Sequence, residues 1–158
     1  MMKRLIFTFV ALIIMICTAS AATICRTFWG CELGVTTQQE AADTIKKQFI
    51  KDAIVPKIDG DYVIVNSVWL YGYQFDETKL KFTNNKLKSI VLTRNFFGLD
   101  QTDSFLKEAS QQFIDQNLIT IKDGLISGRD PSTYVRLAQI ETDDGYAEVK
   151  ILITDLNE

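Results

Sequence analysis

Alternation of apolar and polar residues is clearest between Asp61 and Asn95, which reads DYVIVNSVWLYGYQFDETKLKFTNNKLKSIVLTRN. The stretch is dense in β-branched and aromatic residues, which fit the pleated, half-buried surface of a sheet. We therefore predict three strands here, near Tyr62–Val68, Tyr71–Phe82 and Lys86–Thr93.

Asn84-Asn85 is predicted to form a two-residue hairpin turn, because asparagine tolerates positive φ. In that register the facing pairs are Thr83 with Lys86, Phe82 with Leu87, Lys81 with Lys88, and Leu80 with Ser89. One face of the hairpin then carries Leu80, Phe82, Leu87 and Val91. The other carries four lysines, namely Lys79, Lys81, Lys86 and Lys88. A slip by one residue would expose the apolar set to water, so the register is well specified.

Two stretches have apolar residues at helical spacing. The first, about Thr37–Ile50, starts with a capping-box pattern in which Thr36 or Thr37 caps the helix and an acidic or amide residue three positions on closes the box. The second helix is predicted to begin near Thr102.

Shorter runs of alternation follow the second helix. Leu118–Lys122 is predicted as a short strand, and Ser132–Ile140 with Tyr146–Thr154 as a closing hairpin. The element order is then helix, three strands, helix, two or three strands. Hairpin connections give an antiparallel sheet, whose apolar face the helices must cover. The predicted fold class is α+β: a two-layer sandwich of an antiparallel sheet with two helices on one face. The two halves repeat the same helix-then-sheet order.

Residues 1–21 are predicted to be a cleaved signal peptide. Lys3-Arg4 forms a short basic region, Leu5–Cys17 is almost entirely apolar, and small residues follow up to Ala22. A single α+β domain is expected over residues 22–158, exported to the periplasm or the medium and not integral to a membrane after cleavage. Acylation of Cys17 is the alternative, but Ile16 is bulky where a lipobox has Gly or Ala.

Export changes the charge balance and the interpretation of the cysteines. The 158-residue chain has 17 basic and 20 acidic residues, and removing the two basic residues of the leader leaves 15 against 20. An acidic balance argues against nucleic-acid binding. The two cysteines outside the leader, Cys25 and Cys31, are predicted to form a disulfide in an oxidising compartment, with free thiols as the alternative.

Catalytic signals are weak. The chain contains no histidine, which removes Ser-His-Asp and Cys-His arrangements and most zinc sites. No cofactor motif or metal-ligand series is recognised, so neither is predicted. A carboxylate-dependent hydrolase acting on glycans stays open as an alternative, because the fold and not the sequence sets the spacing of such a carboxylate pair.

Two groups of residues are candidates for binding. The four hairpin lysines form either a solvent-facing surface that prevents edge-to-edge aggregation or a docking face for an anionic partner. Trp69, Tyr71 and Tyr73 alternate with Phe75 in the same register, so all four are expected on one face, as core or as a stacking platform.

Three motifs together resemble the BamE/SmpA-like fold. They are Gly34-Val35-Thr36 at a helix start, the aromatic strand entry Trp69–Gly72, and the strand–Asn–Asn–strand run Leu80–Leu87. That fold is shared with the β-lactamase-inhibitor-protein family, which pairs two such units. The stretch Trp69–Leu87 also looks like small exported proteins of gut bacteria with no assigned activity. The resemblance implies a non-enzymatic protein-binding or envelope-associated module with a protein partner in the cell envelope. An inhibitor of a secreted enzyme is a further alternative, and the oligomeric state is open.

Overall fold

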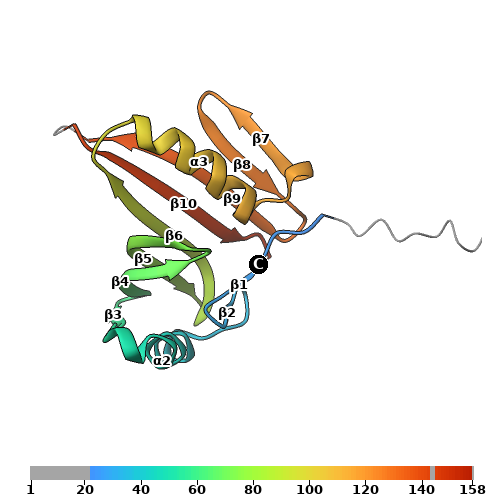
Figure 1. Ribbon diagram of the computed structural model, residues 1–158. Coiled ribbons are helices and arrows are strands. Elements are labelled where there is room, and N and C mark those ends of the chain that lie inside the picture. Colours follow the sequence, from blue (N-terminus) through green and yellow to red (C-terminus); the bar gives the residue numbers. More distant parts are fainter. Residues whose placement is uncertain (1–21, 143–144, 158) are drawn as a thin grey trace, which may run out of the picture.

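A long antiparallel sheet dominates the computed structural model, which describes residues 22–142 and 145–157. The predicted signal peptide, residues 1–21, lies outside the described residues. Eight strands pair in the order β3-β4-β5-β6-β10-β9-β8-β7, and a separate hairpin pairs β1 with β2 (Figure 1). The strands are β1 (Thr27–Phe28), β2 (Cys31–Glu32), β3 (Lys57–Asp59), β4 (Tyr62–Leu70), β5 (Tyr73–Thr83), β6 (Lys86–Phe96), β7 (Ile119–Lys122), β8 (Leu125–Arg129), β9 (Thr133–Glu141) and β10 (Ala147–Asp155).

Two α-helices accompany the sheet, α2 (Gln38–Gln48) and α3 (Asp100–Phe113), with single 3₁₀ turns η1 (Ile50–Asp52) and η2 (Gln116–Leu118). Thr37 caps α2, and its hydroxyl and backbone amide exchange hydrogen bonds with Glu40, so the predicted capping box is confirmed. Helix α2 packs on β4 and β2, whereas α3 packs on β8, β9 and β10 (Figure 1).

The predicted two-layer α+β sandwich is wrong. The helices contain only 11 and 14 residues, contact different ends of the eight-stranded sheet and form no continuous layer, so the protein is β-rich. The strand count was also too low, because β1, β2, β3 and β8 were not predicted. Strand β3 has three exposed residues, and β8 contains Ser127-Gly128, so neither shows clear alternation.

The two halves of the chain repeat one order of elements. Helix α2 precedes strands β3 to β6, and α3 precedes strands β7 to β10. The last strand of each half, β6 and β10, pair antiparallel in the middle of the sheet, from Ala147 opposite Phe96 to Thr154 opposite Ser89. The strand order is therefore symmetric about this central pair.

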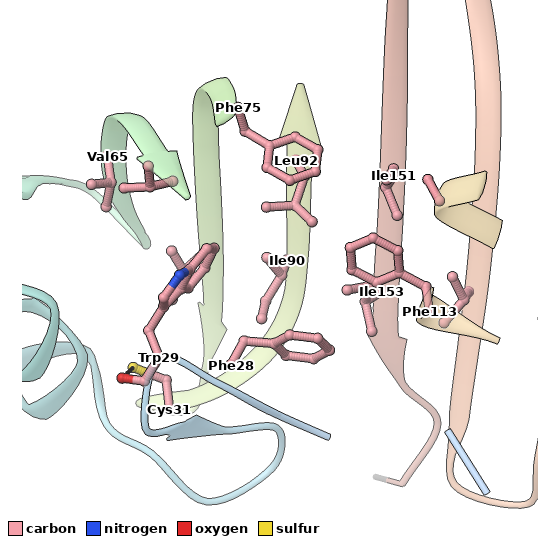
Figure 2. Close-up of a cluster of buried hydrophobic side chains, with 14 of the residues drawn as sticks. Phe28, Trp29, Cys31, Val65, Phe75, Ile90, Leu92, Phe113, Ile151 and Ile153 are labelled. Carbon is pink, nitrogen blue, oxygen red and sulfur yellow. Dashed lines mark hydrogen bonds between the residues drawn. The ribbon is translucent and has the colours of Figure 1, made fainter. Parts of the chain in front are cut away.

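The core lies on one face of the sheet. In β10, Ala147, Val149, Ile151 and Ile153 are fully buried. Figure 2 shows two of them, Ile151 and Ile153, beside Phe113 of α3. Burying each such aliphatic side chain contributes about 1.5–3 kcal/mol.

The segment of residues 22–33 adds further core residues, among them Phe28, Trp29 and Cys31 (Figure 2). An ion pair of 2.7 Å between Arg26 Nη2 and Asp155 Oδ1 holds this segment against the end of β10. The backbone N–H of Ile24 donates to Asp130 Oδ2 over 2.7 Å, which attaches the segment to the loop before β9. Residues distant in sequence thus close one end of the core.

Candidate binding face

The outward-pointing side chains of the sheet form a surface that we call the open face. Along β10 the buried residues alternate with half-buried ones, Glu148, Lys150, Leu152 and Thr154. Both helices direct their buried side chains into the core cluster and not onto this surface. The cross-strand register places the following residues on the open face: Tyr62, Ile64, Lys79, Lys81, Ser89, Val91, Thr93, Lys150, Leu152, Tyr134, Arg136 and Ala138.

One half of the open face is hollowed. The hollow has a volume of about 670 Å³ and lies over β3 to β6 and β10. Apolar side chains in its lining are Tyr62, Ile64 and Val91. Charged ones are Lys79, Lys81, Lys150, Glu77, Glu148, Asp59 and Asp61. The hollow therefore exposes apolar groups beside charges of both signs.

Ion pairs neutralise part of this charge. Lys79 Nζ lies 2.8 Å from Glu77 Oε1, and Lys150 Nζ lies 2.8 Å from Glu148 Oε2. The hydrogen bond to Glu77, followed by its negative charge, raises the pKa of Lys79. Lys81, in contrast, makes no ion pair with any residue that the structure describes.

The four predicted hairpin lysines do not share one face. The Asn84-Asn85 turn is confirmed, with positive φ at both residues and Thr83 opposite Lys86. However, the register shifts between Lys81 and Phe82, so Lys81 faces Ser89 and not Lys88. The predicted like-charge pair is therefore wrong.

The register shift also separates the lysines into two groups. Lys79 and Lys81 line the hollow of the open face. Val91, which was predicted to share a face with the apolar residues of the hairpin, lines the same hollow. Lys86 and Lys88 lie beside a second hollow of about 540 Å³, near Arg26 and Asp155. Lys88 Nζ donates to the Asn157 carbonyl oxygen over 2.6 Å, which engages it in holding the C-terminal end of the chain.

The aromatic candidates do not lie on one face either. Tyr71 and Gly72 form the turn between β4 and β5, both with positive φ, so the alternation of the strand is interrupted there. Trp69 is 54% exposed and Phe75 is fully buried, so the predicted single aromatic face is wrong. The rings of Tyr71 and Tyr73 each lie 5.1 Å, centre to centre, from a phenylalanine of α3. They pack the hairpin tip against the helix, and Trp69 is the most exposed of the four aromatic residues.

The predicted disulfide is absent. Cys25 and Cys31 are both free, the first exposed and the second fully buried. Cys31 pairs with Phe28 in the two-residue ladder of β1 and β2. Cys25 lies before this ladder and is not opposite Cys31. Burial raises the pKa of the Cys31 thiol to about 11.

Within residues 22–142 and 145–157, no three His, Cys, Asp or Glu side chains gather closely enough to hold a metal ion. In the same ranges no helix is long and apolar enough to cross a membrane.

The acidic residues of the hollow include Asp59, whose partner is Lys57 at 3.3 Å, so three of the four acids there are each paired with a lysine. Each of these ion pairs balances the charge of its carboxylate.

Comparison with known proteins found no matching family model, no matching curated protein and no matching solved structure.

Proposed function

We propose that this protein is an exported, non-enzymatic binding module that takes a protein partner on its open face. The observation that carries the proposal is the uncovered side of the sheet. Half-buried Ile64, Val91 and Leu152 lie there beside charged residues, with a hollow of about 670 Å³ next to them. A partner that covered roughly 800 Å² of this face would form an interface of standard size.

Two aspects of the fold support this class of function. The candidate residues lie on strands within a continuous sheet, which presents a binding surface with little loss of conformational freedom on binding. Two helix–four-strand units pair through β6 and β10, which is the arrangement that a resemblance to the family of two joined BamE-like units would imply. An inhibitor of a secreted enzyme is the narrower form of the proposal. It requires a hollowed sheet face with aromatic side chains, and Tyr62 and Tyr134 lie on this one.

A bulky substitution on the open face tests the proposal. Ala138 is half-buried opposite Lys150, and its side chain points away from the core, so Ala138→Trp adds an indole to the surface. The matched control is Asp43→Trp on the exposed side of α2. Each protein is immobilised, exposed to envelope extract of the native cell, and its captured proteins are identified by mass spectrometry.

We expect one protein to be captured by the wild type and by Asp43→Trp, and lost from Ala138→Trp. Both variants should retain the wild-type unfolding midpoint in urea, because surface substitutions usually change the free energy of unfolding by less than about 0.5 kcal/mol. Equal capture by all three proteins would exclude the open face as the binding site.

A further inference from the structure

Positive charge is concentrated on the open face of a chain that is acidic overall. Seven basic residues point outward from the sheet, Lys57, Lys79, Lys81, Lys122, Arg129, Arg136 and Lys150. Four acidic residues accompany them on this side, Asp59, Asp61, Glu77 and Glu148. The whole chain has 17 basic and 20 acidic residues, so the remainder of the molecule is strongly acidic. The open face therefore has the sign of charge opposite to that of the rest of the protein.

Some of these basic side chains form ion pairs within the molecule, and the others are available to bind an anionic partner. Lys57, Lys79 and Lys150 each have an acidic partner within 3.3 Å. Lys81, Lys122, Arg129 and Arg136 form no ion pair with any residue in the described ranges. Their fields project into solvent, where they attract anionic groups most effectively at low ionic strength.

The available cations extend across most of the sheet. Lys81, on β5, and Arg129, on β8, lie in the same cross-strand row, connected through Ser89, Thr154 and Tyr134. Four strand spacings separate them, which amounts to about 19 Å. A single phosphate or carboxylate cannot contact both ends of this row. The matching ligand carries acidic groups distributed over about 20 Å, the dimension of a protein patch.

Apolar residues between the cations favour a protein over other polyanions. Leu152 and Val91 lie in the row that joins Arg136 to Lys79, so each charge has an apolar neighbour. Protein interfaces combine arginine with apolar and aromatic contacts in this way. A flat lipid surface would not enter the hollow, whereas a projecting loop or helix of a protein would fill it.

We infer that the partner of the open face is a protein with an acidic projecting surface, recognised chiefly by Lys81, Arg129 and Arg136. This inference rests on the proposed function. The positive charge of the open face repels basic proteins. It steers acidic proteins towards the face, which raises their association rate.

The test uses poly-L-glutamate as an acidic polypeptide probe and the protein expressed from its full sequence, labelled with ¹⁵N. Chemical-shift changes of the backbone amides report the site and the affinity at 50 mM and 200 mM salt. The variant Lys81→Glu/Arg136→Glu removes two of the available cations. The control Lys46→Glu/Lys47→Glu makes the same change in net charge at exposed positions of α2. Dextran sulfate and vesicles of phosphatidylglycerol with phosphatidylcholine provide the other two anionic surfaces.

We expect poly-L-glutamate to shift amides of β5, β6, β8, β9 and β10, with an affinity that falls at least tenfold between the two salt concentrations. The open-face variant should lower the affinity at least tenfold, and the control should change it by less than twofold. Equal losses in both variants, or tighter binding of either vesicles or dextran sulfate at the open face, would overturn the inference. If the inference fails while Ala138→Trp still abolishes capture, open-face binding stands and only the acidic partner is wrong.

Discussion

Removing Arg26 should destabilise the protein strongly, because its guanidinium satisfies a buried carboxylate and two backbone carbonyls. Asp155 is 5% exposed and accepts its shortest hydrogen bond, 2.7 Å, from Arg26 Nη2. The same side chain donates to the carbonyl oxygens of Ser132, at 2.7 Å, and Leu33, at 2.9 Å. Arg26→Ala leaves the charge of Asp155 buried without its cation.

Loss of one member of a buried ion pair usually costs about 3–5 kcal/mol. Because the Arg26 side chain is 23% exposed and water reaches the site, we expect a value near the lower limit, about 3 kcal/mol. A chain of this size would then lose roughly 10 °C in unfolding temperature. Calorimetry and urea unfolding at pH 7 measure the two quantities. The matched control is Lys57→Ala, which breaks an ion pair between side chains that are 72% and 60% exposed and should cost less than about 0.5 kcal/mol.

The effect of Arg26→Ala should also depend on pH. Burial raises the pKa of Asp155, but hydrogen bonds from Arg26 and Asn157, with the nearby positive charges of Arg26 and Lys88, outweigh burial and lower it. A carboxyl whose pKa is lower in the folded state stabilises the fold above its unfolded pKa of about 3.9, and that stability is lost as the pH falls through the folded value. The difference between wild type and variant should therefore narrow below about pH 4. A loss at pH 7 no larger than that of the Lys57→Ala control would refute the reasoning.

Three further predictions concern packing, thiol chemistry and capping. Gly128→Ala would bring a new Cβ into a clash with Ile114 Cγ2, so we expect urea unfolding to show a loss of about 1–3 kcal/mol, and a smaller loss when the change is made in an Ile114→Ala background, which lacks the clashing atom. Exposed Cys25 should react with a thiol-labelling reagent at pH 8 within minutes, whereas Cys31 should react only after denaturation; fast labelling of Cys31 in the native protein, identified by peptide mass mapping, would contradict the burial of Cys31. Thr37→Ala should cost about 1 kcal/mol in the same urea assay, and no change would show that the capping box contributes nothing.

Local chemistry made part of the fold predictable. The Asn84-Asn85 turn and the Thr37 cap depend on residues near each other in sequence, and both were predicted correctly. Alternation in Tyr146–Thr154 likewise identified β10, because one face of that strand is completely buried.

Features set by tertiary packing were not predictable from the sequence. The register shift beside Lys81 places both Leu87 and Ile90 in the core, whereas strict alternation would put two residues three positions apart on opposite faces. The β4–β5 turn moves Trp69 away from Phe75 in a stretch whose alternation looks uninterrupted. Together these two local changes altered most of the predicted binding surface.

The candidate site was anticipated only in part for the same reason. Lys79 and Lys81 were identified from the hairpin and do lie on the open face. Arg129 and Arg136 were missed, because they are distant from the hairpin in sequence and join these lysines only through the central pairing of β6 with β10. The one available signal was the exposed position of Arg136 between Val135 and Leu137 in the alternating strand β9.

Site-specific photo-crosslinking tests the central claim, that the open face binds a protein, most directly. A benzophenone amino acid replaces Leu152 in the middle of the open face, or Lys47 on the exposed side of α2 as the control, in protein made by the native cell. On irradiation, we predict a single protein adduct from position 152 and none from position 47. Adducts from position 47 with none from position 152 would contradict the account and place the binding surface elsewhere.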